Sequence, residues 1–149
     1  MAYTPPDYGG YERQKADVNY KYGRESTTNA YGRFISQQRG ERGLGDSYRG
    51  YQRQFPRQTA RFGQRGLSGS GVSSGVMQNS MNNFIGDFAR DYGRQQQDLT
   101  QNLQQFDLGQ VDLNAWRQQQ MQAIEAEKQR AIANDAAQLE YLRSIVGGL

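Results

Sequence analysis

The feature that most limits how this chain can fold is its shortage of the side chains that build a core. Leu, Ile, Val and Phe together make up 25 of its 149 residues, or about 17%. Chains in which that share is below about 20% generally do not fold alone, because they bury too little apolar surface to offset the entropy of ordering. The net charge of +3 is too small to keep the whole chain expanded. We therefore expect partial order.

The core-building residues are also unevenly placed along the chain. Seven of the 25 precede residue 71 and eighteen follow it. Glycine stands beside Tyr or Arg at many points of the first half, as in Tyr22-Gly23-Arg24, and glycine at that density weakens any regular element. We predict that residues 1–70 form an extended arm whose order comes from a partner surface.

Charge divides the chain in the same way. Residues 1–66 carry 12 Lys or Arg against 6 Asp or Glu, whereas residues 71–149 carry 6 against 9. Such an asymmetry is typical of a basic arm joined to a mildly acidic body. We therefore place the boundary between the arm and a second region, residues 71–149, near residue 70.

Residues 71–149 show the spacing of amphipathic helices. Apolar side chains recur mostly three or four residues apart, at Met77, Met81, Phe84, Ile85, Phe88, Tyr92, Leu99, Leu103 and Phe106. A second stripe is formed by Trp116, Met121, Ile124, Ile132, Leu139, Leu142 and Val146. We predict two long helices that pack through these narrow stripes, as in a coiled coil or against a larger structure.

The segments around these helices contain candidate breaks. Phe106–Asp112 predicts an interruption, because Gly109 permits a turn and an Asp on either side could cap the next helix. One uninterrupted rod is the alternative, and both remain open. The Gly/Ser-rich run 66–75 predicts a hinge before the first of these helices, with Ser73 or Ser74 as its N-terminal cap.

The composition leaves little chemistry for an enzyme. Cys and His are absent, which removes thiolate nucleophiles, imidazole bases and the usual zinc ligands. Asp87 and Asp91 share a helix face and, with Asp98, could hold a hard cation. However, Arg90 and Arg94 each follow one of these aspartates by three residues, which predicts ion pairs instead. We expect no catalytic residue, no metal site and no cofactor.

The chain also lacks the apolar runs that mark export or membrane insertion. Its first residues have no apolar core of the kind found in a signal peptide, and no stretch approaches about 18 consecutive apolar residues. We expect a soluble protein without a membrane span.

Tyrosine and arginine in the arm have two interpretations. They are favoured at protein interfaces, which predicts a strap that wraps neighbouring subunits. Alternatively, Arg neutralises phosphates while Tyr stacks on bases, which predicts an RNA- or DNA-binding arm beside a helical dimerisation region. We favour the strap and predict the following interface residues: Tyr22, Tyr31, Tyr48, Tyr51, Phe84, Phe88, Tyr92, Leu99, Leu103, Phe106, Trp116, Ile124, Leu139 and Leu142.

One compact motif resembles a known group of proteins. The run from Arg65 to Gly71, Arg-Gly-Leu-Ser-Gly-Ser-Gly, followed by a Gln-rich helix through Phe84 and Phe88, resembles small virion proteins of tailed bacteriophages. The likeness covers about residues 55–106. It implies a structural component of the neck, tail or ejection apparatus, assembled in the host cytoplasm and present in several copies. It also implies that four residues set the angle between arm and helix, namely Arg65, Gly66, Leu67 and Gly71.

The prediction for the whole chain combines these observations. We expect a mainly α protein with an extended Gly/Tyr/Arg-rich arm over residues 1–70 and a helical oligomerisation region over residues 71–149. Its expected role is that of a non-enzymatic tailed-phage virion subunit, which contacts copies of itself and portal, neck or tail subunits. DNA is a further candidate partner. The nucleic-acid-binding protein described above is the alternative, and a helical scaffold that leaves the mature particle is a third.

Overall fold

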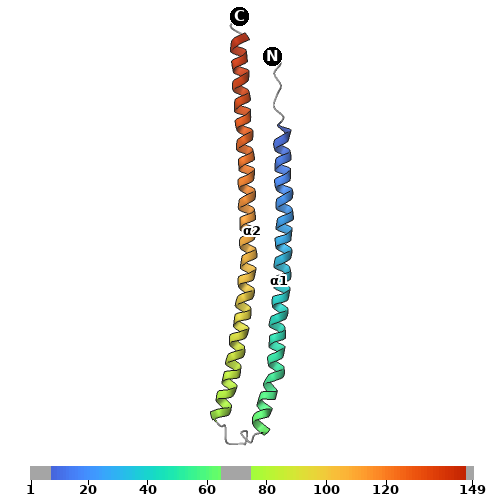
Figure 1. The fold of residues 1–149 in the computed structure, drawn as a ribbon, viewed down its shortest axis with the longest axis vertical. Helices are drawn as coiled ribbons and strands as arrows, with labels where there is room; N and C mark the ends of the chain where they lie inside the picture. The colour runs from blue at the N-terminus through green and yellow to red at the C-terminus, as the bar shows by residue number, and fades with distance from the viewer. Residues whose placement is uncertain (1–7, 65–74, 147–149) are drawn as a thin grey trace. The chain divides into compact units, whose positions relative to one another are not determined.

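Two long α-helices account for nearly all of the chain that the structure describes. The computed structural model describes residues 8–64 and 75–146. Helix α1 spans Gly9–Gln64 and helix α2 spans Gly75–Val146, and no strand occurs within the described residues (Figure 1). The prediction of a mainly α protein is therefore confirmed, and the chain does contain two long helices. Both were expected within residues 71–149, however, whereas a single helix covers the described part of that region and the other lies in the predicted arm.

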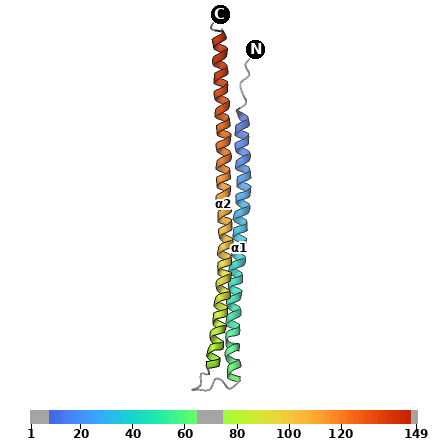
Figure 2. The same ribbon diagram turned by 60° about the vertical axis from the view of Figure 1, so that its left-hand side comes forward.

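The helices divide into two compact units, each of which takes a segment from both helices. Unit 1 consists of Met1–Ala30 and Leu108–Leu149, and unit 2 consists of Tyr31–Asp107. Within each unit the α1 segment and the α2 segment lie side by side and run in opposite directions, as the two views in Figures 1 and 2 agree. Residues on both sides of position 70 thus belong to the same unit.

The prediction of an extended arm over residues 1–70 is wrong for Gly9–Gln64, which is helical. The glycines there were expected to prevent a regular element, and each does cost about 1 kcal/mol relative to Ala inside a helix. Some of them, however, lie where α2 comes closest, so that the lost helix propensity is offset by packing. Gly32 faces the ring of Phe106, and Gly40 faces the side chain of Leu99.

Of the two alternatives for Phe106–Asp112, the structure shows the uninterrupted helix: α2 continues through this segment, and the predicted break does not occur. Phe106 and Gln110 are both half-buried against α1. The Gln110 side chain accepts a hydrogen bond from Ser26 and donates one to the Tyr22 hydroxyl. These contacts favour the helical conformation over the turn that Gly109 would allow.

Few of the side chains that the structure describes are buried between the helices. Ile124, which is 8% exposed, is the single buried side chain among the described residues. Most other apolar side chains of the predicted stripes are half-buried, whereas Ile85 is 42% exposed and lies beside the contact line that Phe84 and Phe88 follow. No helix in the described part of the chain is both long and apolar enough to cross a membrane.

Candidate interaction surfaces

In unit 1 the two helices meet through charged side chains. The Lys15 ammonium donates to Glu125 Oε2 at 2.7 Å, and the Lys128 ammonium donates to Glu12 Oε1 at 3.1 Å. Lys15 also lies 3.8 Å from Glu12, so the four groups form one alternating network. Both ammonium groups are largely covered, with side chains 22% and 25% exposed. The order of these pairs requires α1 and α2 to run antiparallel in this unit. Glu12 precedes Lys15 on α1, whereas the partner of Glu12, Lys128, follows the partner of Lys15, Glu125, on α2.

The network shifts the pKa of three of its members, Glu12, Lys15 and Glu125, in the directions that favour their charged forms. The hydrogen bond from Lys15 lowers the pKa of Glu125, and the hydrogen bond from Lys128 lowers the pKa of Glu12. The hydrogen bond to Glu125 raises the pKa of Lys15. These shifts favour the charged forms of Glu12, Lys15 and Glu125, and the attraction between opposite charges holds the two helix segments in register.

A ladder of uncharged polar side chains continues the contact within unit 1. The Tyr22 hydroxyl donates to Asn114 Oδ1 at 2.6 Å, and Ser26 Oγ donates to Gln110 Oε1 at 3.1 Å. The Arg117 guanidinium donates to Asn19 Oδ1 at 3.0 Å and lies over the Tyr22 ring, 4.8 Å from its centroid. Polar groups that satisfy one another in this way allow helices to associate where apolar side chains are scarce.

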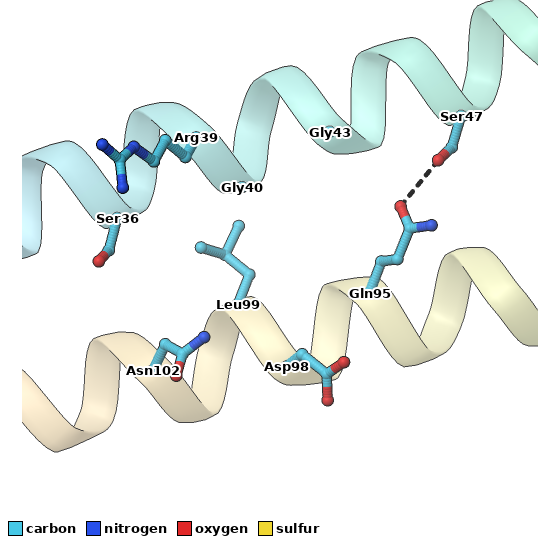
Figure 3. A pocket seen from close by; sticks show the side chains of 9 residues that line it. All are labelled: Ser36, Arg39, Gly40, Gly43, Ser47, Gln95, Asp98, Leu99 and Asn102. Carbon is cyan, nitrogen blue, oxygen red and sulfur yellow. Dashed lines mark hydrogen bonds between the residues drawn. The ribbon is translucent and has the colours of Figure 1, made fainter.

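In unit 2 small residues on α1 face large residues on α2. A Cβ added at Gly32 would lie 2.8 Å from the Phe106 ring, and one added at Gly40 would overlap the Leu99 methyl groups. Figure 3 shows the Leu99 side chain directed at the Gly40 backbone. Glycine at both positions therefore permits a close approach of the two helices that any other residue would obstruct.

An aromatic cluster lies in the part of unit 2 where α1 ends and α2 begins. Tyr51 stacks on Phe88 with ring centroids 4.2 Å apart and on Phe84 at 5.5 Å. Phe55 and Tyr92 extend the cluster on either side, each 5.5–5.7 Å from a neighbouring ring. Stacked and tilted pairs of this kind contribute about 0.5–1.5 kcal/mol each beyond the area that they bury.

The close approach leaves a groove of about 520 Å³ along one side of unit 2. Ser47 Oγ donates to Gln95 Oε1 at 2.8 Å across it, as the dashed line in Figure 3 marks. Its lining combines the Leu99 side chain and two glycines, Gly40 and Gly43, with polar side chains. The groove is lined by Ser36, Arg39, Gly40, Gly43, Ser47, Gln95, Asp98, Leu99 and Asn102.

Two of the three acidic side chains that could have held a cation, Asp87 and Asp91, form the predicted ion pairs. Arg90 lies 2.5 Å from Asp87, and Arg94 lies 3.2 Å from Asp91, in each case three residues along α2. Within the described residues no group of three acidic side chains is arranged to hold a metal ion.

Most of the predicted interface residues lie along the line where α1 and α2 of this same chain meet. Ile124 is buried, and ten others are half-buried: Tyr22, Tyr51, Phe84, Phe88, Tyr92, Leu99, Leu103, Phe106, Trp116 and Leu139. Three are exposed, namely Tyr31, Tyr48 and Leu142. Contact of any of them with a neighbouring molecule stays a prediction. The predicted hinge residues Arg65, Gly66, Leu67 and Gly71 and the predicted caps Ser73 and Ser74 lie outside the described residues.

Sequence reasoning missed the groups that pair α1 with α2. Glu125 and Lys128 are three residues apart on α2, a spacing that favours a pair within one helix, yet each bonds to the other helix. The small residues of α1 were interpreted as breakers. Their spacing was the available signal, because Gly32, Ser36, Gly40, Gly43 and Ser47 follow one another at helical steps of three or four.

Comparison with known proteins adds no relative from which a function could be transferred. No protein-family model, curated protein sequence or solved structure matches this chain.

Proposed function

We propose that this chain is a non-enzymatic structural subunit of a tailed-phage virion, present in several copies and packed against copies of itself and other virion proteins. One observation carries the proposal, namely how little apolar surface the two helices cover for each other. The chain exposes 11583 Å², whereas a compact monomer of 16.9 kDa would expose roughly 7,700 Å². The difference, roughly 3,900 Å² for one chain, exceeds the roughly 1,000–2,500 Å² that each partner buries in an obligate interface, so contacts with more than one neighbour would fit it.

Large apolar side chains are available for such contacts in both units. Interfaces are enriched in aromatic residues, and their buried cores are more apolar than the rest of the surface. In unit 2 the exposed members are Tyr31, Phe34, Tyr48, Val76 and Ile85. In unit 1 they are Tyr20, Leu108, Val111, Ile132, Tyr141, Leu142 and Ile145.

An uncharged stripe on α2 in unit 1 also suits packing between identical copies. Its residues are exposed and follow one another at steps of three or four, and like charges are absent where copies would meet. The alanines would let a neighbouring helix come close. The stripe consists of Leu108, Val111, Ala115, Gln118, Gln122, Ala126, Gln129, Ala133 and Ala136.

The assignment to a tailed-phage virion rests on the resemblance of about residues 55–106 to small virion proteins of these phages. In such a particle the chain would be a component of the neck, tail or ejection apparatus, beside portal, neck or tail subunits. The proposal of a non-enzymatic role rests on the chemistry of the side chains. The chain contains neither His nor Cys, and the serine that is bonded across the groove, Ser47, donates to an amide rather than to a base.

Fractionation of native particles tests this function. Phage particles would be separated on a density gradient before and after treatment with nuclease and high salt, and the chain would be followed by peptide mass spectrometry. The proposal predicts that the chain stays with intact particles in a fixed copy number after both treatments. Release by nuclease alone would contradict it in favour of a nucleic-acid-binding protein. Absence from finished particles but presence in immature ones would identify a scaffold instead.

A further inference from the structure

Helix α1 carries a row of arginines on one face within unit 2. Arg39, Arg42, Arg49, Arg53 and Arg57 are separated by three, seven, four and four residues. With 3.6 residues per turn these steps return to one side of the helix, over a rise of about 27 Å. All five side chains are exposed. We call this set the arginine ridge.

The ridge is poorly neutralised by the rest of its unit. Asp46 occupies the helical step between Arg42 and Arg49, and it lies 3.6 Å from the Arg49 guanidinium. Arg39, Arg42, Arg53 and Arg57 form no ion pair with any described residue. Asp98 lines the groove together with Arg39 but is not bonded to it. The arginines of α2 in the same unit, Arg90 and Arg94, are instead paired with aspartates.

The ridge also lacks the side chains that anchor a protein partner. From Arg39 to Arg57 no large aromatic or aliphatic side chain lies at the helical steps of the ridge. Gly43 and Gly50 lie next to it, with open space where a Cβ would be. Protein interfaces concentrate their binding energy in buried aromatic and apolar anchors with a polar rim. A surface on which five guanidinium groups surround the single carboxylate of Asp46 binds through charge.

The guanidinium group is matched to phosphate. Its planar fork donates two parallel hydrogen bonds to two oxygens of one phosphate, and its charge is permanent. Four residues of helix advance the chain by about 6 Å, so successive arginines can follow successive anionic groups along an extended polymer. We propose that the arginine ridge binds the phosphate backbone of nucleic acid without reading its sequence.

Such a site has a defined thermodynamic signature. Each phosphate that is neutralised releases condensed counterions, so the logarithm of the binding constant falls with the logarithm of salt by about 0.9 per contact on duplex DNA. The four unpaired arginines correspond to four contacts. Affinity for a duplex should then fall about 150-fold between 50 and 200 mM salt. Contacts without base readout should give similar affinities for duplexes of different sequence.

The test measures binding of the full chain to a fluorescent 20-base-pair DNA duplex by anisotropy between 50 and 200 mM NaCl. The ridge variant is R42Q/R53Q/R57Q. The matched control is R24Q/R130Q/R143Q, which removes the same three charges from exposed positions of unit 1. We expect the fall in affinity over this salt range to shrink to about 3-fold in the ridge variant and to stay near 150-fold in the control.

Circular dichroism checks that both variants keep the helix content of the native chain. If the ridge variant is less helical, the single substitution Arg53→Gln replaces it, with an expected loss of about 0.9 from the salt slope. Equal weakening in ridge variant and control would overturn the proposal, because net charge alone would then explain binding. So would an absence of duplex binding at 50 mM salt. Poly-glutamate binding as tightly as the duplex would also overturn it and identify an acidic polypeptide as the partner.

Discussion

Units 1 and 2 solve the same packing problem with different side chains. Both must hold two antiparallel helix segments together in a chain with few core-building residues. Unit 1 does so with the Lys15–Glu125 and Glu12–Lys128 pairs and a ladder of amides and hydroxyls, around the single buried residue Ile124. Unit 2 places glycine opposite large side chains and stacks Tyr51 on Phe88.

The comparison shows that glycine can have opposite effects on the stability of the two units. At Gly40 the missing side chain creates the space that Leu99 fills, so glycine there contributes to packing. At Gly23 in unit 1 a Cβ would meet nothing within 4 Å, so glycine there only lowers helix propensity. Unit 2 should therefore depend on shape and unit 1 on charge, and substitutions can separate the two.

The largest effect is expected from removing the central ring of unit 2. Tyr51→Ala deletes the ring that stacks on Phe84 and Phe88, and we expect it to lower the free energy of unfolding by about 3 kcal/mol. Tyr31→Ala is the matched control, because Tyr31 is 66% exposed, and it should cost less than about 0.5 kcal/mol in the isolated chain. Chemical denaturation followed by circular dichroism measures both. Equal losses would mean that the stacked rings do not hold unit 2 together.

A smaller loss is expected from filling the closest approach of the helices. Gly40→Leu forces α1 away from Leu99 and should destabilise unit 2 by about 2 kcal/mol, as overpacked cores do. Gly43→Leu introduces the same side chain three residues away into open space and should instead stabilise the helix by about 0.8 kcal/mol. We expect Gly40→Leu to lower the melting temperature and Gly43→Leu to raise it. A gain from both substitutions would show that α1 does not contact α2 at Gly40.

Acid should weaken unit 1 through its carboxylates. The pKa values of Glu12 and Glu125 are lowered in the folded chain, so the unfolded chain binds more protons as pH falls. Their contribution is present above the unfolded pKa near 4.5 and is lost as pH falls through the lower folded values. Glu125→Gln should therefore flatten the fall of the melting temperature between about pH 5 and 3. An unchanged pH profile would show that the network does not stabilise the fold.

The hydrogen bond to Glu125 raises the pKa of Lys15, so the stabilising contribution of the network should also be lost at alkaline pH. A raised pKa contributes stability that is fully present below the unfolded value of about 10.4 and is lost as pH rises through the folded value. Lys15→Gln should remove this alkaline loss. Melting temperatures of this variant and of the native chain between pH 9 and 11 would measure it.

The smallest expected effect is a gain in unit 1. Gly23→Ala adds a methyl group that meets no neighbour, and it should raise the free energy of unfolding by roughly 0.5–1 kcal/mol through helix propensity and a less flexible unfolded chain. Thermal melts followed by circular dichroism would detect it. A loss would mean that Gly23 lies against a surface, for example that of a neighbouring copy.

The sequence predicted the helical class and much of the stripe on α2, because apolar spacing reports directly on the face of a helix that is covered. It also predicted the Asp87–Arg90 and Asp91–Arg94 pairs, which depend on spacing within one helix. It did not predict α1, because a glycine that serves close packing and a glycine that breaks a helix are the same residue until the facing side chain is known. It also did not predict the bonds of Lys15 and Lys128 to the other helix. Such bonds depend on the register between two segments about 110 residues apart, which the spacing within one helix does not report.

The central claim is that copies of this chain associate and cover one another's exposed apolar side chains. Sedimentation velocity across a range of protein concentrations, with circular dichroism on the same samples, tests it most directly. The comparison would include Y48D/I85D, which adds charge at two exposed apolar positions of unit 2, and Q52D/Q97D, which adds it at exposed polar ones. We predict oligomers with masses that are multiples of 16.9 kDa, lost in Y48D/I85D and kept in Q52D/Q97D, with helix content rising as oligomers form. A fully helical monomer at every concentration would contradict the account.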